Sequence, residues 1–214
     1  MNCCYIIGAG DFEGAELLHP QKGDKVIAAD GGLDHLRKIG MEPDIVLGDF
    51  DSLSSERIAC LQSGKWQLVN FPPEKDYTDM MLAAETGYEQ GFREFKIFGG
   101  TGGRMDHTLA NIQVLANLTR RGCRVWLIGH DFRITAVHNG HIQFPESCRG
   151  YFSVYAFSDV ALGVNEKGFK YGLDNFTLKN DDPRGISNEF CGLPGEISVA
   201  EGTLLICMEN TNGF

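Results

Sequence analysis

Two aspartates follow a short apolar run in the N-terminal half of the chain. The run Ile45–Gly48 ends at a glycine, and Asp49, Asp51 and the hydroxyl of Ser52 come directly after it. Ligands of α/β proteins bind at the carboxyl ends of strands, and two carboxylates crowded there repel each other unless a cation separates them. Mg²⁺ takes carboxylate oxygens together with water and phosphate. The stretch therefore predicts a metal–phosphate site, and a solvated turn that caps a helix explains it equally well.

The strongest local signal is the run 99–107, GGTGGRMDH, in which a predicted strand leads into four glycines and a helix follows. Glycine-rich loops at helix N-termini bind phosphate through backbone N–H groups and the positive end of the helix dipole. Arg104 adds a bidentate phosphate donor. His107 is a candidate general base, although a lone histidine at a helix start is more often a structural hydrogen-bonding group. The run is neither a Walker A motif nor the G-x-G-x-x-G fingerprint.

Two further turns carry acids. Lys75, Asp76, Thr78 and Asp79 open the predicted helix 79–90. The lysine suits a phosphate and Asp79 suits a metal, while Asp76 or Thr78 can cap the helix. A solvated helix start, where the dipole favours acids, explains Asp76 well but Lys75 poorly.

The turn Asp30-Gly31-Gly32 follows the predicted strand 25–29. Its glycines let a ligand approach the backbone, and Asp30 can contact a nucleotide or support metal ligands. The alternative, nearly as strong on the residues alone, is that Asp30 caps the next helix.

These motifs lie in an alternating pattern of strands and helices that continues to about residue 135. The predicted strands are 3–8, 25–29, 45–48, 67–71, 94–98 and 124–128, and the predicted helices are 14–18, 32–39, 54–63, 79–90 and 108–121. Alternation with continuous apolar strands predicts an α/β domain with a mostly parallel sheet flanked by helices. Several strands end in glycine or acid, and we expect these turns to converge at one edge of the sheet.

After residue 135 the pattern changes to short alternating runs at 134–137, 141–144, 151–157, 169–173, 197–201 and 203–208. This pattern predicts a small antiparallel β domain, so we divide the chain into domains 1–135 and 136–214. Within the second, Phe169 and Tyr171 and the pair Ser187-Asn188 offer aromatic and small polar groups. These groups suit a flat heteroaromatic substrate. The alternative, that they are only parts of a strand and a turn, explains the same residues equally well.

Composition excludes several classes of protein. The chain has 214 residues, 43% of them hydrophobic, and a formal net charge of -10, which argues against a nucleic-acid partner. Seven cysteines without a C-x-x-C pair indicate reduced thiols rather than zinc or disulfides. No apolar run approaches a membrane span, and the strand pattern begins at Cys3 without a visible targeting segment. We therefore expect a cytoplasmic protein with no membrane partner.

Taken together and in order, the motifs resemble those of thiamine pyrophosphokinases. The matching segments are 30–32, 43–52, 75–79, 102–107 and 186–188, which span nearly the whole chain. The resemblance implies an N-terminal α/β domain, a C-terminal β-sandwich, and a homodimer with active sites at its interface. It also implies transfer of a diphosphoryl group from ATP to the hydroxyl of thiamine, giving thiamine diphosphate and AMP.

The resemblance and the chemistry of the motifs together predict roles for individual residues. Mg²⁺ would be held by Asp49, Asp51 and Asp79. The nucleotide would be bound by Asp30, Gly31, Lys75, Thr78, Gly102, Gly103, Arg104 and His107. Catalysis would involve Asp51, Asp76, Asp79, Arg104 and Asp106, with Asp76 or Asp106 accepting the proton. Thiamine would be bound by Tyr171, Ser187 and Asn188. Some members stack a β-domain tryptophan near thiamine, but both tryptophans here precede residue 136, which leaves that role to Tyr171 or Phe169.

Other functions share parts of the pattern. An HAD-like phosphatase carries Asp-x-Asp after its first strand, whereas the pair here follows the third, and the glycine-rich loop would go unexplained. A glycosyltransferase uses Asp-x-Asp to bind a metal and a nucleotide sugar. A nucleotide-sensing module without enzymatic activity would need neither the acidic cluster nor Lys75.

Overall fold

The computed structural model describes residues 2–48, 64–70 and 77–210. The chain divides into two compact units, one made of 1–114 and 127–130 and the other of 115–126 and 131–214. The predicted helix 54–63 lies outside the described residues. The division into domains 1–135 and 136–214 stays a prediction.

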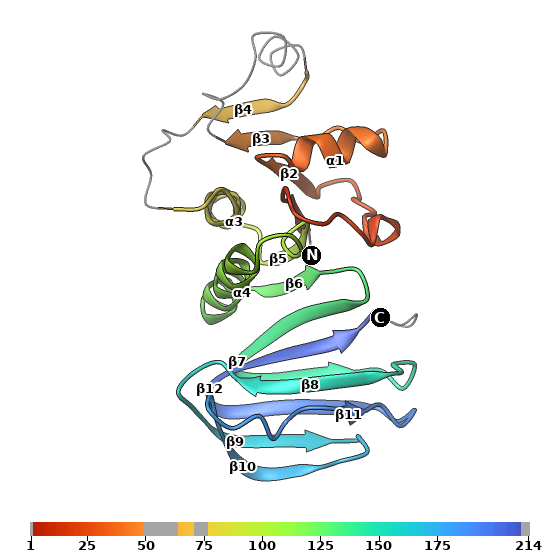
Figure 1. Cartoon of the computed structure of the whole chain (residues 1–214), viewed down its shortest axis with the longest axis vertical. Coiled ribbons are helices and arrows are strands. Elements are labelled where there is room, and N and C mark those ends of the chain that lie inside the picture. The colour runs from red at the N-terminus through yellow and green to blue at the C-terminus, as the bar shows by residue number, and fades with distance from the viewer. Residues whose placement is uncertain (1, 49–63, 71–76, 211–214) are drawn as a thin grey trace. The chain divides into compact units, whose positions relative to one another are not determined.

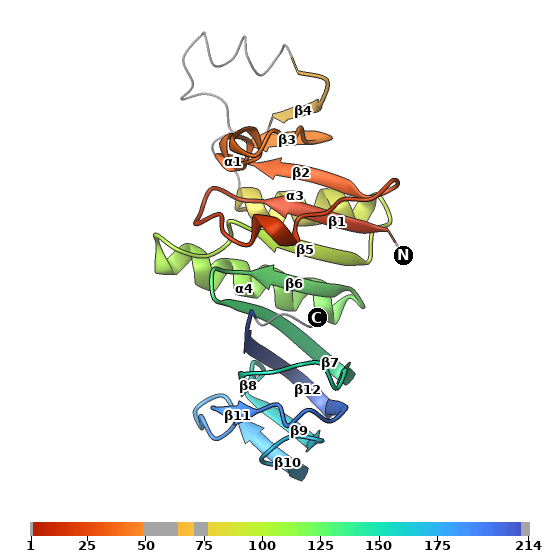
Figure 2. The same cartoon turned by 90° about the vertical axis from the view of Figure 1, so that its right-hand side faces the viewer.

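The first unit contains a parallel sheet with the order β5 (Glu94–Phe98), β1 (Cys3–Ile7), β2 (Lys25–Ala29), β3 (Ile45–Gly48) and β4 (Gln67–Asn70). Figures 1 and 2 show these strands side by side. The side chains of β1 and β3 are buried throughout, as expected for strands covered on both faces. The predicted parallel sheet is confirmed, with strand bounds that agree to within a residue. β6 (Arg124–Ile128) contributes to both units.

The connections are the short 3₁₀ helix η1 (Ala15–Leu17) and the helices α1 (Gly32–Lys38), α3 (Asp79–Glu89) and α4 (Met105–Arg120). α1 packs against β1 and β2, and α3 packs against β1, β2 and β3. α4 begins three residues before the predicted start at residue 108, so that Asp106 and His107 lie in its first turn.

The strand order changes direction at β1. Successive strands β2, β3 and β4 are added on one side of β1, and β5 then returns to its other side. In open α/β sheets the ligand crevice lies outside the carboxyl ends of the two strands where the order reverses. The topology therefore points to the loops that follow β1 and β5.

The second unit is an antiparallel β structure, as predicted. Its strands are β7 (Phe132–Phe144), β8 (Tyr151–Ala156), β9 (Val160–Lys167), β10 (Leu173–Lys179), β11 (Asn188–Glu189) and β12 (Gly195–Glu209). β12 organises them, because it pairs with β7 along its length, with β9 near its start and with β8 near its end. Four phenylalanine rings, at 144, 152, 169 and 190, meet in its core with centroids 4.6 to 6.2 Å apart.

Several predictions for the second unit were wrong. The predicted strand 169–173 is absent except for Leu173, because the Phe169 ring packs into the aromatic cluster and its backbone makes an isolated bridge to Phe190. β9 was not predicted, since Gly163 and the inward-facing acid Glu166 interrupt its apolar alternation. The runs 134–137 and 141–144 form one strand, as do 197–201 and 203–208 with a register shift between them.

Among the described residues the cysteines at 3, 4, 123, 148, 191 and 207 form no disulfide with one another; the prediction of reduced thiols stays a prediction. None of the helices in the described ranges has both the length and the apolar composition that crossing a bilayer requires.

Candidate active site

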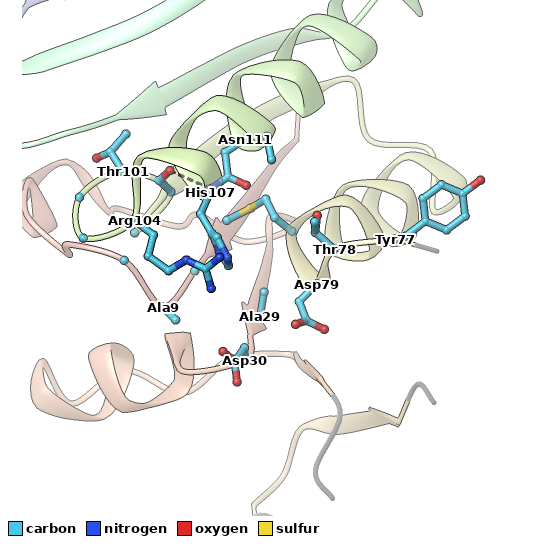
Figure 3. A pocket seen from close by; sticks show the side chains of 18 residues that line it. Ala9, Ala29, Asp30, Tyr77, Thr78, Asp79, Thr101, Arg104, His107 and Asn111 are labelled. Atoms are coloured by element: carbon cyan, nitrogen blue, oxygen red, sulfur yellow. Dashed lines mark hydrogen bonds between the residues drawn. The ribbon is translucent and has the colours of Figure 1, made fainter. Parts of the chain in front are cut away.

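A pocket of about 440 Å³ lies at the carboxyl edge of the parallel sheet, within the first unit (Figure 3). Its walls are the loops after β1, β2 and β5 and the first turns of α3 and α4. The lining residues are 8–10, 29–30, 77–80, 99–104, 107, 110 and 111. This is the position where the strand order reverses, and the predicted convergence of these three turns is confirmed.

Backbone hydrogen bonds join the loop after β1 to the glycine-rich loop after β5. The N–H groups of Gly8, Gly10 and Asp11 donate to the carbonyl oxygens of Phe98, Gly99 and Thr101, each at 2.8 Å. The pairing of the two strands thus continues past their ends. The glycine-rich loop is therefore held in place by its neighbour before it enters α4.

The glycines of this loop are required for two different reasons. Gly99, Gly102 and Gly103 all have positive φ angles, a region that side chains with a Cβ rarely adopt. A Cβ on Gly99 would also collide with the backbone of Gly8, whereas a Cβ on Gly103 would meet no atom within 4 Å. The first glycine allows the two loops to touch, and the last leaves its backbone open to a ligand.

Arg104 and Asp106 form a two-point ion pair at the start of α4. Nε of Arg104 donates to Oδ1 of Asp106 at 3.1 Å and Nη2 donates to Oδ2 at 2.5 Å. The guanidinium lowers the pKa of the Asp106 carboxyl and the carboxylate raises the pKa of Arg104. Arg104 lines the pocket and Asp106 does not. In this arrangement Asp106 is a weak base that orients the arginine.

Two acids face the pocket from the other walls. Figure 3 shows the carboxylates of Asp30 and Asp79 on one side, with the Arg104 side chain reaching toward the same space from the glycine-rich loop. The interpretation of Asp30 as a helix cap is wrong, because the N-cap of α1 is Gly31 and no side chain caps that helix. Asp30 instead adopts a positive φ of 51° while its N–H donates to the carbonyl of Leu47 at 2.9 Å.

The remaining predicted residues divide into three groups. Thr78, Gly102, Gly103 and His107 line the pocket, and the Thr78 hydroxyl also accepts the Met81 N–H at 3.2 Å as the cap of α3. Gly31 does not line the pocket. Asp49, Asp51, Lys75 and Asp76 lie outside the described residues. Tyr77, which was not among the predicted residues, also lines the pocket.

Oxygen donors of the kind that Mg²⁺ prefers are present in the form of Asp30 and Asp79. Within residues 2–48, 64–70 and 77–210, no three His, Cys, Asp or Glu side chains are assembled in a metal-binding group. The described acids fit a cation that takes one or two carboxylates and completes its shell with phosphate and water.

Asn111 is a pocket residue that the sequence interpretation missed. Its buried amide donates from Nδ2 to the carbonyl oxygen of Gly100 at 2.7 Å, which fixes the glycine-rich loop from the side of α4. The spacing from His107 is a usable signal, because residues at i and i+4 share one helix face.

The residues predicted to bind thiamine lie in the second unit. Tyr171 and Ser187 are exposed, whereas Asn188 is buried. Ser187 has a positive φ of 58°, and its N–H donates to Oγ of Ser153 at 3.1 Å. Of the two aromatic candidates for stacking, Phe169 is engaged in the phenylalanine cluster and Tyr171 presents its ring to solvent.

Comparisons with known proteins agree with this arrangement. The family described as thiamin pyrophosphokinase, catalytic domain, matches residues 19–127, and the thiamin pyrophosphokinase vitamin B1 binding domain matches residues 139–204. A thiamine pyrophosphokinase of Bacillus subtilis (strain 168) is 33% identical over 182 residues, covering 84% of this chain and 85% of the relative.

Solved structures give the same result. The crystal structure of thiamine pyrophosphokinase from Bacillus subtilis superposes with a TM-score of 0.87 at 27% identity, covering 97% of this chain and 99% of the other. That of the Geobacillus thermodenitrificans protein gives 0.85 at 27% identity, covering 99% of each chain. Sequence motifs, pocket and relatives therefore lead to one conclusion: the chain belongs to the thiamine pyrophosphokinase family.

Proposed function

We propose that the pocket of the first unit binds the phosphates of ATP, and that from there this chain transfers a diphosphoryl group to the hydroxyl oxygen of thiamine. As a member of its family the chain is an enzyme that diphosphorylates thiamine with ATP. The observation that carries the assignment of the pocket is the glycine-rich loop, held between the β1 loop and α4 where the strand order reverses.

The loop and the helix after it offer positive potential on a chain whose formal net charge is -10. α4 has 16 residues and begins directly at the pocket, so its dipole favours an anion there. The guanidinium of Arg104 enters the same space. Oriented by Asp106, it would donate two parallel hydrogen bonds to phosphate oxygens.

Mg²⁺ would be held by Asp49, Asp51 and Asp79. Asp79 is at the pocket, and the other two follow β3, whose neighbour β2 leads into the pocket at Asp30. When bound, the ion neutralises negative charge on the phosphate oxygens. The hard oxygen donors of these residues suit magnesium better than zinc or copper.

In the reaction, the thiamine hydroxyl oxygen forms a bond to the β-phosphorus of ATP. The bond from that phosphorus to the oxygen shared with the α-phosphate breaks, and AMP leaves with this oxygen and its electron pair. Such transfer depends on positioning and on charge neutralisation more than on covalent catalysis. Arg104, His107 and the loop N–H groups would supply the positioning and the positive charge. Asp76 remains the proposed proton acceptor, because Asp106 is bound to Arg104.

The second unit would bind thiamine, with Tyr171 stacking on a heteroaromatic ring of the substrate and Ser187 contacting it. We place the protein in the cytoplasm.

A homodimer would complete the active site. Support for a dimer comes from β8, where Tyr151, Ser153 and Tyr155 share one face and both tyrosines are exposed. Ser153 in turn accepts a hydrogen bond from the Ser187 N–H. This bond connects the exposed face of β8 to the thiamine segment, by which we mean residues 186–188. Sedimentation in the presence and absence of thiamine tests this part.

The test of the reaction is a product analysis. The purified protein is incubated with Mg-ATP, with and without thiamine, and the nucleotides are separated. AMP formed only when thiamine is present supports the proposal. ADP or inorganic phosphate released without thiamine would instead support a phosphatase, and nucleotide binding without turnover would support a sensing module.

A further inference from the structure

A buried acid lies next to the thiamine segment of the second unit without a role in the proposed reaction. Glu166 on β9 is 3% exposed, and its strand neighbours in register, Ile197 on β12 and Leu173 on β10, are apolar. Its Oε2 accepts a 2.6 Å hydrogen bond from Nδ2 of Asn188. Its Oε1 is buried with no hydrogen-bond partner among the described residues. Buried carboxyl groups are costly, so this position requires an explanation.

The amide of Asn188 uses all of its hydrogen-bonding capacity inside the protein. Nδ2 donates to Glu166 and to the carbonyl oxygen of Tyr171 at 2.7 Å, while Oδ1 accepts the N–H groups of Tyr171 at 3.1 Å and Glu189 at 2.8 Å. The orientation of the amide is unambiguous, because a flipped amide would place two donors against two donors. Asn188 therefore has no group left with which to contact a ligand.

We propose that Glu166 is a positioning residue of the thiamine site: its carboxyl group fixes the Asn188 amide, which in turn fixes the backbone of Tyr171 beside Ser187. This inference rests on the proposed function for its ligand. It assigns direct contact with thiamine to Tyr171 and Ser187, whereas Asn188 makes no contact with thiamine and holds the Tyr171 backbone in place. Burial raises the pKa of Glu166 to about 7, against the opposing effect of the hydrogen bond from Asn188. The carboxyl group accepts from the amide in either protonation state.

The arrangement ties together two segments that are far apart in the sequence. The 169–171 segment is joined to β11 by the Phe169–Phe190 bridge, by the Lys170 N–H to the carbonyl of Glu189 at 3.1 Å, and by the Asn188 amide. Of these three links, the amide is the one that reaches the exposed Tyr171. Without Glu166, one Nδ2 proton would be buried and unpaired, and the amide would rotate away from Tyr171.

Two variants test the proposal. Glu166→Gln keeps a carbonyl oxygen to accept from Asn188, and Glu166→Met keeps the length of the side chain but removes the acceptor. We expect Glu166→Met to raise the KM for thiamine about tenfold, the equivalent of one buried hydrogen bond, with the KM for ATP unchanged. Glu166→Gln should restore the wild-type value. Glu201→Met, an exposed glutamate on β12, is the control and should leave both constants unchanged.

Hydrogen exchange supplies a readout that needs no turnover. The amide protons of Tyr171 and Glu189 should exchange at least about tenfold faster in Glu166→Met than in the wild type and in Glu166→Gln. Faster exchange combined with a wild-type protein that forms no AMP would leave the positioning role intact and reject the proposed function. Equal exchange and an equal KM for thiamine in all variants would reject the positioning role.

Should Glu166→Met fail to fold, Asn188→Asp tests the amide itself, because it removes both the Nδ2 bond to Glu166 and the Nδ2 bond to the carbonyl oxygen of Tyr171. It retains the acceptor for Tyr171 and Glu189 and removes the two Nδ2 donors, so that the connection to Glu166 is lost. The proposal predicts a raised KM for thiamine with the KM for ATP unchanged. An unchanged KM for thiamine in a folded Asn188→Asp variant would overturn it.

Discussion

The side-chain amide of Asn111 hydrogen-bonds to the carbonyl oxygen of Gly100 at 2.7 Å, and both residues are buried. The bond connects the second turn of α4 to the loop that leads into the helix. The bond therefore holds the glycine-rich loop, which we propose to bind phosphate, against the helix that follows it.

Replacing Asn111 by Leu leaves the Gly100 carbonyl buried and unpaired. We expect a loss of about 1–3 kcal/mol in the free energy of unfolding and a higher KM for ATP with a smaller change for thiamine. Asn117→Leu on the same helix is the control, because its weak 3.4 Å bond to Arg121 makes a small effect expected. Urea denaturation and initial rates measure both variants. Equal effects of the two substitutions would show that the Asn111 bond does not hold the loop.

Gly99 and Gly103 have the same φ of 61° but different surroundings. Gly103→Ala should cost only the roughly 1–2 kcal/mol of a left-handed conformation. Gly99→Ala should cost more and reduce activity further, because its Cβ meets the backbone of Gly8. Thermal unfolding of the two alanine variants measures the difference. A Gly103 variant less stable than the Gly99 variant would contradict the proposed packing of the two loops.

Arg104→Met should lower kcat/KM for ATP by about 10²–10³-fold, the usual effect of removing one donor to a developing charge. Folding stability should change little, since the Arg104–Asp106 pair is exposed and screened by solvent. Asp106→Asn, which keeps the guanidinium but releases it, should have a smaller effect. Steady-state kinetics combined with melting curves test the pair of variants. A larger loss of activity in Asp106→Asn would return Asp106 to the role of catalytic base.

Glu166 should make the stability of the protein depend on pH. Its pKa is about 7 in the folded state, against 4.5 as its ordinary value, so the unfolded chain releases the proton first. The free energy of unfolding should therefore fall as the pH rises from about 4.5 to about 7, by on the order of 3 kcal/mol, and remain level above that range. Denaturation of the wild type and Glu166→Gln at several pH values measures this, and the variant should lack the Glu166 contribution. Identical pH profiles would mean that the carboxyl group titrates normally.

Patterns along the sequence were sufficient to predict the described strands of the parallel sheet. The strands 25–29, 45–48, 94–98 and 124–128 were predicted with the observed bounds, because buried parallel strands are continuous apolar runs between turn residues. The pocket followed from the convergence of strand ends. The role of Asn111 did not follow, since its partner is a backbone carbonyl that becomes its neighbour only once the loop has folded.

The second unit was harder to predict because its contacts are long-range. Glu166 is an acidic residue, which the sequence alone would place on the exposed face of a strand. Its hydrogen-bond partner in the core is Asn188, 22 residues later in the chain. β10 pairs with β9 through two register shifts, which destroy the period-two pattern on which a strand prediction relies. Phe169 and Tyr171 look alike in the sequence, and only the aromatic cluster decides which of them is exposed.

The fate of labelled phosphate tests the central claim most directly. The protein is supplied with Mg²⁺, thiamine and ATP labelled either at the γ-phosphate or at the α-phosphate. A single transfer of the diphosphoryl group predicts that the γ label appears in thiamine diphosphate, that the α label appears only in AMP, and that the two products are equimolar. Labelled inorganic phosphate, or ADP with thiamine monophosphate, would contradict it.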